Sequence, residues 1–318
     1  YDWSSDPIVW KHLLDQPFSL DCNTNENSNN EQIFFEVSAK YDTREPLAKI
    51  YPHMKITISP SLIVENLLPC DIQFCIFSKQ EEMKKNKVLE TSKKMTVYDV
   101  SLDNFLLLSI QPLQDDVTMS KATIINTPKN SQLEPENVLT LKYPNGQQLQ
   151  VCIKYHSIER SRAKIIKIFS PYIIMNCTDR DLYMEGSFGN IMQSKVITDN
   201  ENRYTLPRMF SFDVAEDKNN RARVRFRESN WSTLLSLDAV GQSFDVTMGV
   251  LDKALECNLG VSIAEGTGKF GLSKVVSISP RYIVKNELNF PISLCETGSV
   301  NSTEIEANGS IALYNLRN

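Results

Sequence analysis

The chain has 318 residues, of which 41% are hydrophobic and 23% are charged, and its formal net charge is −5 at pH 7. This composition is typical of a globular protein with enough apolar side chains to bury a core. The slightly acidic balance argues against nucleic acid as a partner, because a phosphate-binding surface usually makes a domain basic. No run of 18 apolar residues is present and no basic-then-apolar leader opens the chain. We therefore expect neither a membrane-spanning helix nor a secretion signal.

A short motif that contains Ser-Pro and ends in Asn occurs three times, at residues 58–66, 169–176 and 278–286. The closing residues are evenly spaced, 110 residues apart, and they are Asn66, Asn176 and Asn286. A fixed period of this length predicts tandem copies of one folded unit. Because repeat sequence runs to both ends, we expect a piece of a longer protein. The expected division is a β half-unit over residues 1–53, β repeats over 54–163 and 164–273, and the start of a further β repeat over 274–318.

Residues 1–53 lack the motif but resemble the half-unit that precedes its third copy. Trp10 and the stretches Phe18–Asp21 and Phe35–Val37 occur in an order that the later sequence repeats. Their expected counterparts are Trp231, Leu235–Asp238 and Phe244–Val246. The polar, Asn-rich stretch between the first two strands predicts the loop of a hairpin.

Each motif has the pattern of a β-strand. In the first copy Leu62, Val64 and Asn66 alternate with Ile63 and Glu65, which places the two sets on opposite faces. The residue before the asparagine varies freely between copies, so we expect its face to lie outside and the asparagine to point inward. A turn and a second apolar stretch follow each asparagine, and this order predicts a hairpin.

The remaining sequence of each unit consists of short apolar runs separated by Pro, Asn and Gly, with no sustained helical spacing. It predicts an all-β fold of tandem β-sandwich-like repeats of about 110 residues with little helix. The seven cysteines are odd in number, and most lie in strand-like sequence. This usage favours reduced thiols in a cytosolic protein over a disulfide framework.

Motifs for catalysis or cofactor binding are weak. Gly266–Gly271 spells G-x-G-x-x-G, but nucleotide binding requires a helix directly after that pattern, and Leu272–Ile278 reads as a strand. The three histidines lie far apart and have no cysteine or carboxylate at ligand spacing, so a zinc site is not expected. No Ser/His/Asp or Cys/His arrangement is present. We expect no enzyme activity, no cofactor and no metal.

The sharpest charge pattern is an alternation of arginine with apolar residues. In a strand the apolar residues between the arginines would face the core. The arginines would share the other face, and they are Arg221, Arg223, Arg225 and Arg227. Two interpretations stay open. The face is either solvated and paired with acidic neighbours, or it contacts acidic lipid headgroups or an acidic partner segment.

The repeated asparagine also allows two interpretations. An inward asparagine at the end of a strand can hydrogen-bond the backbone of the following turn, because its side chain both donates and accepts. Its loss would then leave turn groups unpaired and weaken the unit. Alternatively, the amide contacts a ligand directly.

The recurring motif, from Ile58 to Pro69 and again from Ser170 to Asn176, resembles the adaptor-binding region of the vacuolar protein sorting-associated protein 13 family. The resemblance implies about six β-rich repeats, each with an asparagine that matches Asn66, Asn176 or Asn286, and Leu67–Pro69 resembles the first of them. It further implies a non-catalytic, peripheral module that recruits a bridge-like lipid transfer protein to organelle membrane contact sites. The implied partners are adaptor proteins of vacuole, mitochondrion or endosome, bound through short proline-x-proline segments. Direct binding of an anionic membrane through the arginine strand is the alternative.

Overall fold

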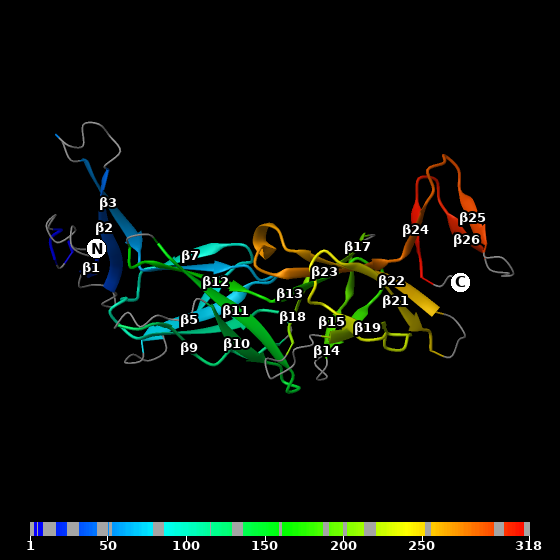
Figure 1. Ribbon diagram of the computed structural model, residues 1–318, viewed down its shortest axis with the longest axis horizontal. Coiled ribbons are helices and arrows are strands. Elements are labelled where there is room, and N and C mark those ends of the chain that lie inside the picture. Colours follow the sequence, from blue (N-terminus) through cyan, green and yellow to red (C-terminus); the bar gives the residue numbers. More distant parts are fainter. Residues whose placement is uncertain are drawn as a thin grey trace. The chain divides into compact units, whose positions relative to one another are not determined.

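The fold is built almost entirely of β-strands (Figure 1). The computed structural model describes residues 3, 4, 6–8, 17–23, 32–42, 50, 53–78, 86–114, 116–128, 136–158, 161–186, 191–199, 202–212, 221–251, 256–295 and 302–314. Within these residues the only helical element is one 3₁₀ turn, η2 (Gly268–Phe270). The predicted all-β class is confirmed. Trp10 lies outside the described residues.

The chain divides into two compact units. The first comprises Tyr1–Gly146 with Val151–Phe169, and the second comprises Gln147–Gln150 with Ser170–Asn318. The boundary near residue 170 coincides with the second Ser-Pro motif.

The first motif begins a β-sandwich of two sheets, with five and four strands. The five-stranded sheet contains, in order, β10 (Glu136–Lys142), β11 (Gln148–Ser157), β12 (Lys164–Phe169), β4 (Leu62–Asn66) and β7 (Lys94–Val97). The four-stranded sheet contains β6 (Lys87–Leu89), β5 (Ile72–Ser78), β8 (Leu106–Pro112) and β9 (Thr123–Asn126). Alternate residues of β4 are fully buried, as the sequence pattern predicts.

The second motif begins a sandwich of the same plan. Its five-stranded sheet contains β18 (Arg208–Phe210), β13 (Tyr172–Asn176), β23 (Lys274–Pro280), β22 (Glu256–Glu265) and β21 (Ser243–Gly249). Its four-stranded sheet contains β15 (Ile191–Ser194), β14 (Leu182–Gly186), β19 (Arg221–Phe226) and β20 (Leu235–Ser236), and β16 (Val196–Asp199) pairs with β17 (Asn202–Thr205) beside them.

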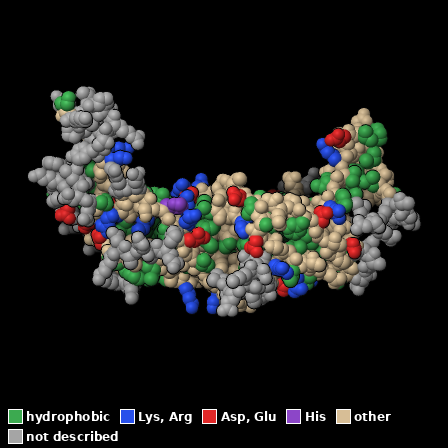
Figure 2. All heavy atoms as spheres, viewed as in Figure 1, with side chains coloured by type: hydrophobic (Ala, Val, Ile, Leu, Met, Phe, Trp, Pro, Cys, Tyr) green, Lys and Arg blue, Asp and Glu red, His purple; other side chains and the backbone are tan. Residues whose placement is uncertain are grey.

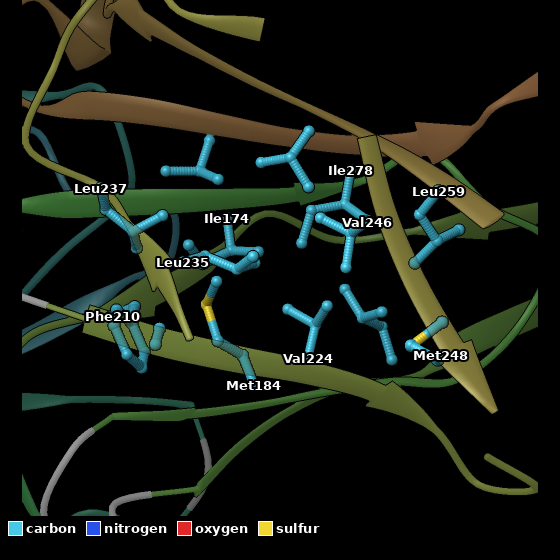
Figure 3. Close-up of a cluster of buried hydrophobic side chains, with 14 of the residues drawn as sticks. Ile174, Met184, Phe210, Val224, Leu235, Leu237, Val246, Met248, Leu259 and Ile278 are labelled. Carbon is cyan, nitrogen blue, oxygen red and sulfur yellow. The ribbon is translucent and has the colours of Figure 1, made fainter. Parts of the chain in front are cut away.

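Both sheets of this second sandwich contribute to one hydrophobic core (Figure 3). Ile174 and Ile278 come from the five-stranded sheet, and Met184 and Val224 come from the four-stranded sheet. All four side chains are fully buried. Burial of such side chains supplies about 1.5–3 kcal/mol each and holds the two sheets together.

Consecutive copies share a sheet through parallel strands. The motif strand β4 pairs in parallel with β12, the strand that leads into the second motif. The motif strand β13 pairs in the same way with β23, which leads into the third motif. In both pairs the residue eight positions before the next asparagine stands opposite the asparagine, with Ile168 against Asn66 and Ile278 against Asn176. Each sandwich is therefore closed by the strand that leads into the following copy.

The two outer parts of the chain contain portions of this plan. In the half-unit, β1 (Phe18–Asn23), β2 (Gln32–Asp42) and β3 (His53–Pro60) form an antiparallel sheet around Leu20 and Val37. In the third copy, β24 (Tyr282–Lys285) pairs with β27 (Ser310–Leu313), and β25 (Ile292–Cys295) pairs with β26 (Ser302–Ile305).

The predicted hairpin is wrong. β4 pairs with β12 and β7, whereas β5 pairs with β6 and β8 in the other sheet. The turn after the asparagine is therefore an arch that carries the chain from one sheet to the other. Apolar alternation in two neighbouring strands is equally compatible with both arrangements, because it reports only which face of each strand is buried.

The predicted match of Phe35–Val37 with Phe244–Val246 is also wrong. Val37 pairs with Ile58, and Val261 pairs with Ile278, so Val37 corresponds to Val261. Phe18 and Phe244 are then equivalent, because each stands opposite that valine on the neighbouring strand. An apolar-acidic-apolar triplet recurs in several strands, and only the pairing register identifies which copies correspond.

Replacement of Ile278 by alanine tests the shared sheet. Ile278 is fully buried, so we expect Ile278→Ala to lower the free energy of unfolding by about 2–5 kcal/mol. Ile58 holds the equivalent position before the first motif but is 56% exposed, so Ile58→Ala should change it by about 0.5 kcal/mol or less. Urea unfolding of both variants measures the difference. Equal losses would contradict this description of the copies.

Candidate functional site: the repeated asparagine and the arginine face

The side chain of Asn66 closes the arch that follows its own strand. Its Oδ1 accepts a hydrogen bond from the backbone N–H of Leu68 at 3.0 Å, and its Nδ2 donates to the carbonyl of Cys70 at 3.0 Å. Nδ2 also donates to the carbonyl of Leu89, at the end of β6, at 3.1 Å. One buried amide therefore fixes the arch and joins the five-stranded sheet to the four-stranded sheet.

The other two asparagines make the same pair of bonds. In each copy Oδ1 accepts from the N–H two residues on, and Nδ2 donates to the carbonyl four residues on. The partners are Thr178 N–H (3.1 Å) and the Arg180 carbonyl (2.9 Å) for Asn176, and Leu288 N–H (3.0 Å) and the Phe290 carbonyl (2.9 Å) for Asn286.

The bond between sheets recurs in the third copy, where Asn286 Nδ2 donates to the carbonyl of Ile305 at 3.1 Å. In the second copy the hydroxyl of Thr178 donates to Asn176 Oδ1 at 2.7 Å, and its oxygen also lies 3.1 Å from the Arg180 carbonyl oxygen. The three asparagines are 0%, 4% and 1% exposed, so a ligand at the surface does not reach their amides. The geometry supports the structural interpretation of these residues.

Loss of the Asn66 amide should destabilise the first sandwich. Asn66→Ala leaves the Leu68 N–H and two carbonyls without partners in a buried arch, so we expect a loss of about 1–3 kcal/mol or more. Asn66→Asp should also destabilise, because a carboxylate cannot donate to those carbonyls. Urea unfolding checks both changes, with the exposed Asn202→Ala as the control. An unchanged midpoint for Asn66→Ala would contradict the assigned role.

The arginine face lies on β19, as the alternation predicts: Ala222, Val224 and Phe226 are buried in the core of the second sandwich. We define the arginine face as Arg221, Arg223, Arg225 and Arg227. The Nε of Arg223 lies 2.5 Å from a carboxylate oxygen of Glu185, on the neighbouring strand β14. This ion pair fits the interpretation of a solvated face with acidic neighbours.

Aromatic rings engage the two central arginines. The guanidiniums of Arg223 and Arg225 lie 5.2 and 4.7 Å from the centre of the Trp231 ring, and Arg225 also lies 5.4 Å from the Tyr183 ring. Stacking of this kind contributes about 0.5–1 kcal/mol at exposed sites. It holds the central arginines against the sheet, whereas Arg221 and Arg227 are exposed at either end of the face.

The glycine motif is a tight loop. It continues through η2 into β23, and no α-helix follows it among the described residues, so it offers no row of free amide groups for a phosphate. A Cβ atom at Gly266 would lie 1.9 Å from the carbonyl oxygen of Phe270. The close approach of two backbone segments therefore explains this glycine.

Reactive groups do not gather at a common site in the described part of the chain. No cluster of three or more His, Cys, Asp or Glu side chains there could hold a metal ion. Burial raises the pKa of Cys152 to about 12 and that of Cys257 to about 11, which keeps both thiols protonated at neutral pH. No helix among these residues is long and apolar enough to cross a bilayer.

One carboxyl is strongly perturbed but closed to solvent. Glu36 on β2 is 0% exposed, and its Oε1 accepts a hydrogen bond from the hydroxyl of Ser19 at 2.5 Å. Arg162 lies 3.8 Å from its Oε2 and also pairs with Asp103. Desolvation raises the pKa of Glu36 despite the hydrogen bond from Ser19 and the charge of Arg162, which act in the opposite direction. A substrate has no access to this group, so its perturbation concerns stability.

The first unit should lose stability with rising pH because of Glu36. Below its ordinary pKa of 4.5 the carboxyl is protonated in the folded and unfolded chains alike. Above 4.5 the unfolded chain releases the proton first, so stability falls until pH exceeds the raised pKa of the folded state. Glu36→Gln should remove this dependence, whereas the exposed Glu90→Gln should retain it. Urea unfolding at several pH values measures the slopes, and identical slopes would contradict the assignment.

Comparison with known proteins identifies the family. The sequence profile of the adaptor binding domain of vacuolar-sorting associated protein 13 matches residues 1–318. The chain belongs to this family. The resemblance carried by the three motifs is thereby confirmed over the full sequence.

Relatives include three intermembrane lipid transfer proteins. The chain is 29% identical over 307 residues to VPS13 of Chaetomium thermophilum, which covers 94% of this chain and 10% of that protein. It is 22% identical over 273 residues to VPS13A of Mus musculus, a match that covers 80% of this chain and 8% of that protein. It is 24% identical over 300 residues to Vps13D of Drosophila melanogaster, a match that covers 84% of this chain and 7% of that protein. The chain thus spans a tenth or less of the length of these relatives.

Several residues contribute to these sites although the sequence did not predict their roles. Thr178 completes the second arch, and Trp231 stacks against the arginine face. The hydroxyl of Tyr314 donates to Asp179 Oδ1 at 2.5 Å, and the tyrosine carbonyl accepts from the N–H of Asn258 at 2.9 Å, which anchors the third copy to the second sandwich. Only the Asn-x-Thr order of Thr178 is a local signal. The Tyr314 contacts join residues more than 50 positions apart.

Proposed function

We propose that the chain is a non-catalytic adaptor-binding module of an intermembrane lipid transfer protein. In this role it recruits the transporter to organelle membrane contact sites by binding proline-x-proline segments of adaptor proteins on vacuole, mitochondrion or endosome. The observation that carries the proposal is the match of the whole chain to the adaptor binding domain family. The lipid transfer proteins among its relatives support the place of such a module in a larger transporter. The module would act on the cytoplasmic side as a peripheral component.

The β-sandwich plan is suited to this task. Each sandwich ends in edge strands that can accept an extended peptide as an added strand, while side-chain pockets recognise alternate residues. Proline has no backbone N–H, and residues at alternate positions of a strand direct their N–H groups to the same edge. A proline-x-proline segment therefore lacks donors on one edge only. Its opposite edge keeps every N–H and C=O, so a proline-x-proline segment can still pair with a sheet.

Peptide binding to the full chain tests the proposal. Fluorescence anisotropy would compare labelled adaptor peptides that contain Pro-x-Pro with matched Ala-x-Ala peptides. We expect the proline peptides to bind at least tenfold more tightly, since the prolines pre-order the extended conformation and fill the side-chain pockets. Equal binding of the two peptide sets, or binding of neither, would contradict the proposal.

The asparagines enter this function through folding. Asn66→Ala, Asn176→Ala and Asn286→Ala should weaken peptide binding only to the extent that they unfold the arch of their own copy. Parallel measurements of binding and of urea unfolding separate the two effects. A variant that keeps full stability but loses binding would instead assign its asparagine to direct contact with the peptide.

Direct binding of an anionic membrane through the arginine face is the second candidate. Its support is the exposure of Arg221 and Arg227 at the two ends of the arginine face. Flotation with phosphatidylserine vesicles tests it, with neutral vesicles as the control. Arg221→Gln with Arg227→Gln should abolish salt-sensitive binding. Unchanged flotation of this double variant, or no flotation of the wild type, would refute the candidate.

A further inference from the structure

The second copy carries an insertion that the other two copies lack. In every copy the chain runs from a residue opposite the sixth position after the asparagine to a residue opposite the fourth position before it. This step is eight residues long in the first and third copies and sixteen in the second. Its ends in the first, third and second copies are Leu89 and Val97, Ile305 and Leu313, and Ser194 and Phe210. The eight extra residues belong to the hairpin of β16 and β17.

Hydrogen bonds to the arch hold both ends of this hairpin. At its start the N–H of Val196 donates to Asp181 Oδ1 at 2.8 Å. At its end the hydroxyl of Thr205 donates to the carbonyl of Asn176 at 2.5 Å. The hairpin therefore begins and ends at fixed points beside the repeated asparagine.

One face of the hairpin is apolar and exposed. Ile197 of β16 stands opposite Tyr204 of β17, and alternation places Leu206 on the same face as Tyr204. Tyr204 is 45% exposed and Leu206 is 46% exposed. A two-stranded hairpin is marginally stable by itself, and a third strand or a packing partner usually completes it.

This position of a copy is exposed even where a complete sandwich follows. In the first copy the equivalent connection is the polar turn of residues 90–93. The side chains of Glu90, Ser92 and Lys93 are exposed there, although the chain continues into the second sandwich. The exposure of the inserted hairpin is thus a property of its place in the copy.

One edge of the hairpin can accept a further strand. The N–H of Val196 is directed to Asp181 and therefore away from β17. Because these directions alternate along an antiparallel strand, Thr198 also directs its N–H and C=O away from β17. Thr198 is exposed, and no described strand pairs with this side of β16. We call it the free edge of β16.

We propose that a proline-x-proline segment of an adaptor adds to the free edge of β16 as an antiparallel third strand. This inference rests on the proposed adaptor-binding function and assigns it a site. The central residue x stands opposite Thr198 and exchanges two backbone hydrogen bonds with it. The prolines then stand opposite Ile197 and Asp199, where an antiparallel pair requires no N–H from them.

The same register places both prolines on the apolar face. Residues directly opposite each other in antiparallel strands direct their side chains to one face, so the prolines share the face of Ile197 and Tyr204. In pairs without hydrogen bonds the Cα atoms approach to about 4.5 Å, which brings one proline ring against Ile197. The proline, Ile197 and Tyr204 would form an apolar strip across three strands. Backbone geometry and side-chain chemistry therefore favour the same ligand.

Charge gives no comparable support for a membrane at this hairpin. Basic and acidic side chains are interspersed over the face of the molecule shown in Figure 2. The hairpin region is mixed in the same way, because Lys195 and Arg203 are basic, Asp199 is acidic, and all three are exposed. An extended peptide, bound by backbone and apolar side chains, is the occupant that the hairpin fits.

Exchange of the hairpin for the short turn of the first copy tests the site. Residues 195–206 are replaced by the sequence of residues 90–93. The N–H of Thr91 in that turn donates to Asp71 Oδ1 at 2.8 Å, so it can replace the bond from Val196 to Asp181. In fluorescence anisotropy we expect the exchanged chain to bind labelled Pro-x-Pro peptides about tenfold or more weakly than the wild type, and Ala-x-Ala peptides as the wild type does.

Single substitutions test the edge and the face separately. Thr198→Pro removes the N–H at the free edge and spares the pairing with β17, and Thr198→Val keeps the N–H as the matched control. Tyr204→Ser removes the ring from the apolar face, and Tyr204→Phe retains it. We expect Thr198→Pro and Tyr204→Ser each to weaken binding of the Pro-x-Pro peptides about tenfold, and both controls to change it by about twofold or less.

Several outcomes would overturn the site, provided that circular dichroism and urea unfolding show the variants to be folded. Proline-selective binding that survives both the hairpin exchange and Thr198→Pro would refute the site and leave the proposed function standing. A wild type without proline-selective binding would refute both. If the exchange leaves peptide binding unchanged but abolishes vesicle flotation or self-association, the hairpin serves a membrane or a second copy instead.

Discussion

The architecture depends on the need of a buried asparagine amide for hydrogen-bond partners. An unpaired buried donor or acceptor costs about 1–3 kcal/mol, so an asparagine is stable inside a sandwich only where the backbone brings partners to it. The arch does this by placing the N–H of Leu68 and the carbonyl of Cys70 around Asn66, with the carbonyl of Leu89 from the other sheet. Because the same requirement recurs with Asn176 and Asn286, each copy must cross between its sheets at the same point.

The arch explains why copies interlock. Once β5 has crossed to the second sheet, it no longer pairs with β4, and the free side of β4 is filled by β12. The sequence period therefore does not coincide with a self-contained sandwich: each sandwich runs from one motif to the strand that leads into the next. Consecutive copies are joined by backbone hydrogen bonds as well as by side chains.

Local sequence patterns predicted much of this fold. They report on residues within one strand, so they do not identify pairings between strands that are distant in the sequence. Alternation along one strand identified the all-β class, the inward asparagines and the burial of Val224 between arginines. The recurring motif resembles the family whose profile matches the whole chain. The parallel pair of β4 and β12 joins residues about 100 positions apart, and the sequence of neither strand identifies its partner. The arch was mistaken for a hairpin because the partners of β4 and β5 lie elsewhere in the sequence.

The structure also bears on where such a module can recognise partners. The amides that mark each copy bond the backbone inside the fold, so a partner at the surface would meet strand edges and outer faces instead. The central arginines of the outer face of β19 are held by Glu185, Trp231 and Tyr183. An edge, in contrast, offers unpaired backbone groups, and these bind extended segments of many sequences. The selectivity of an edge must then come from the side chains beside it.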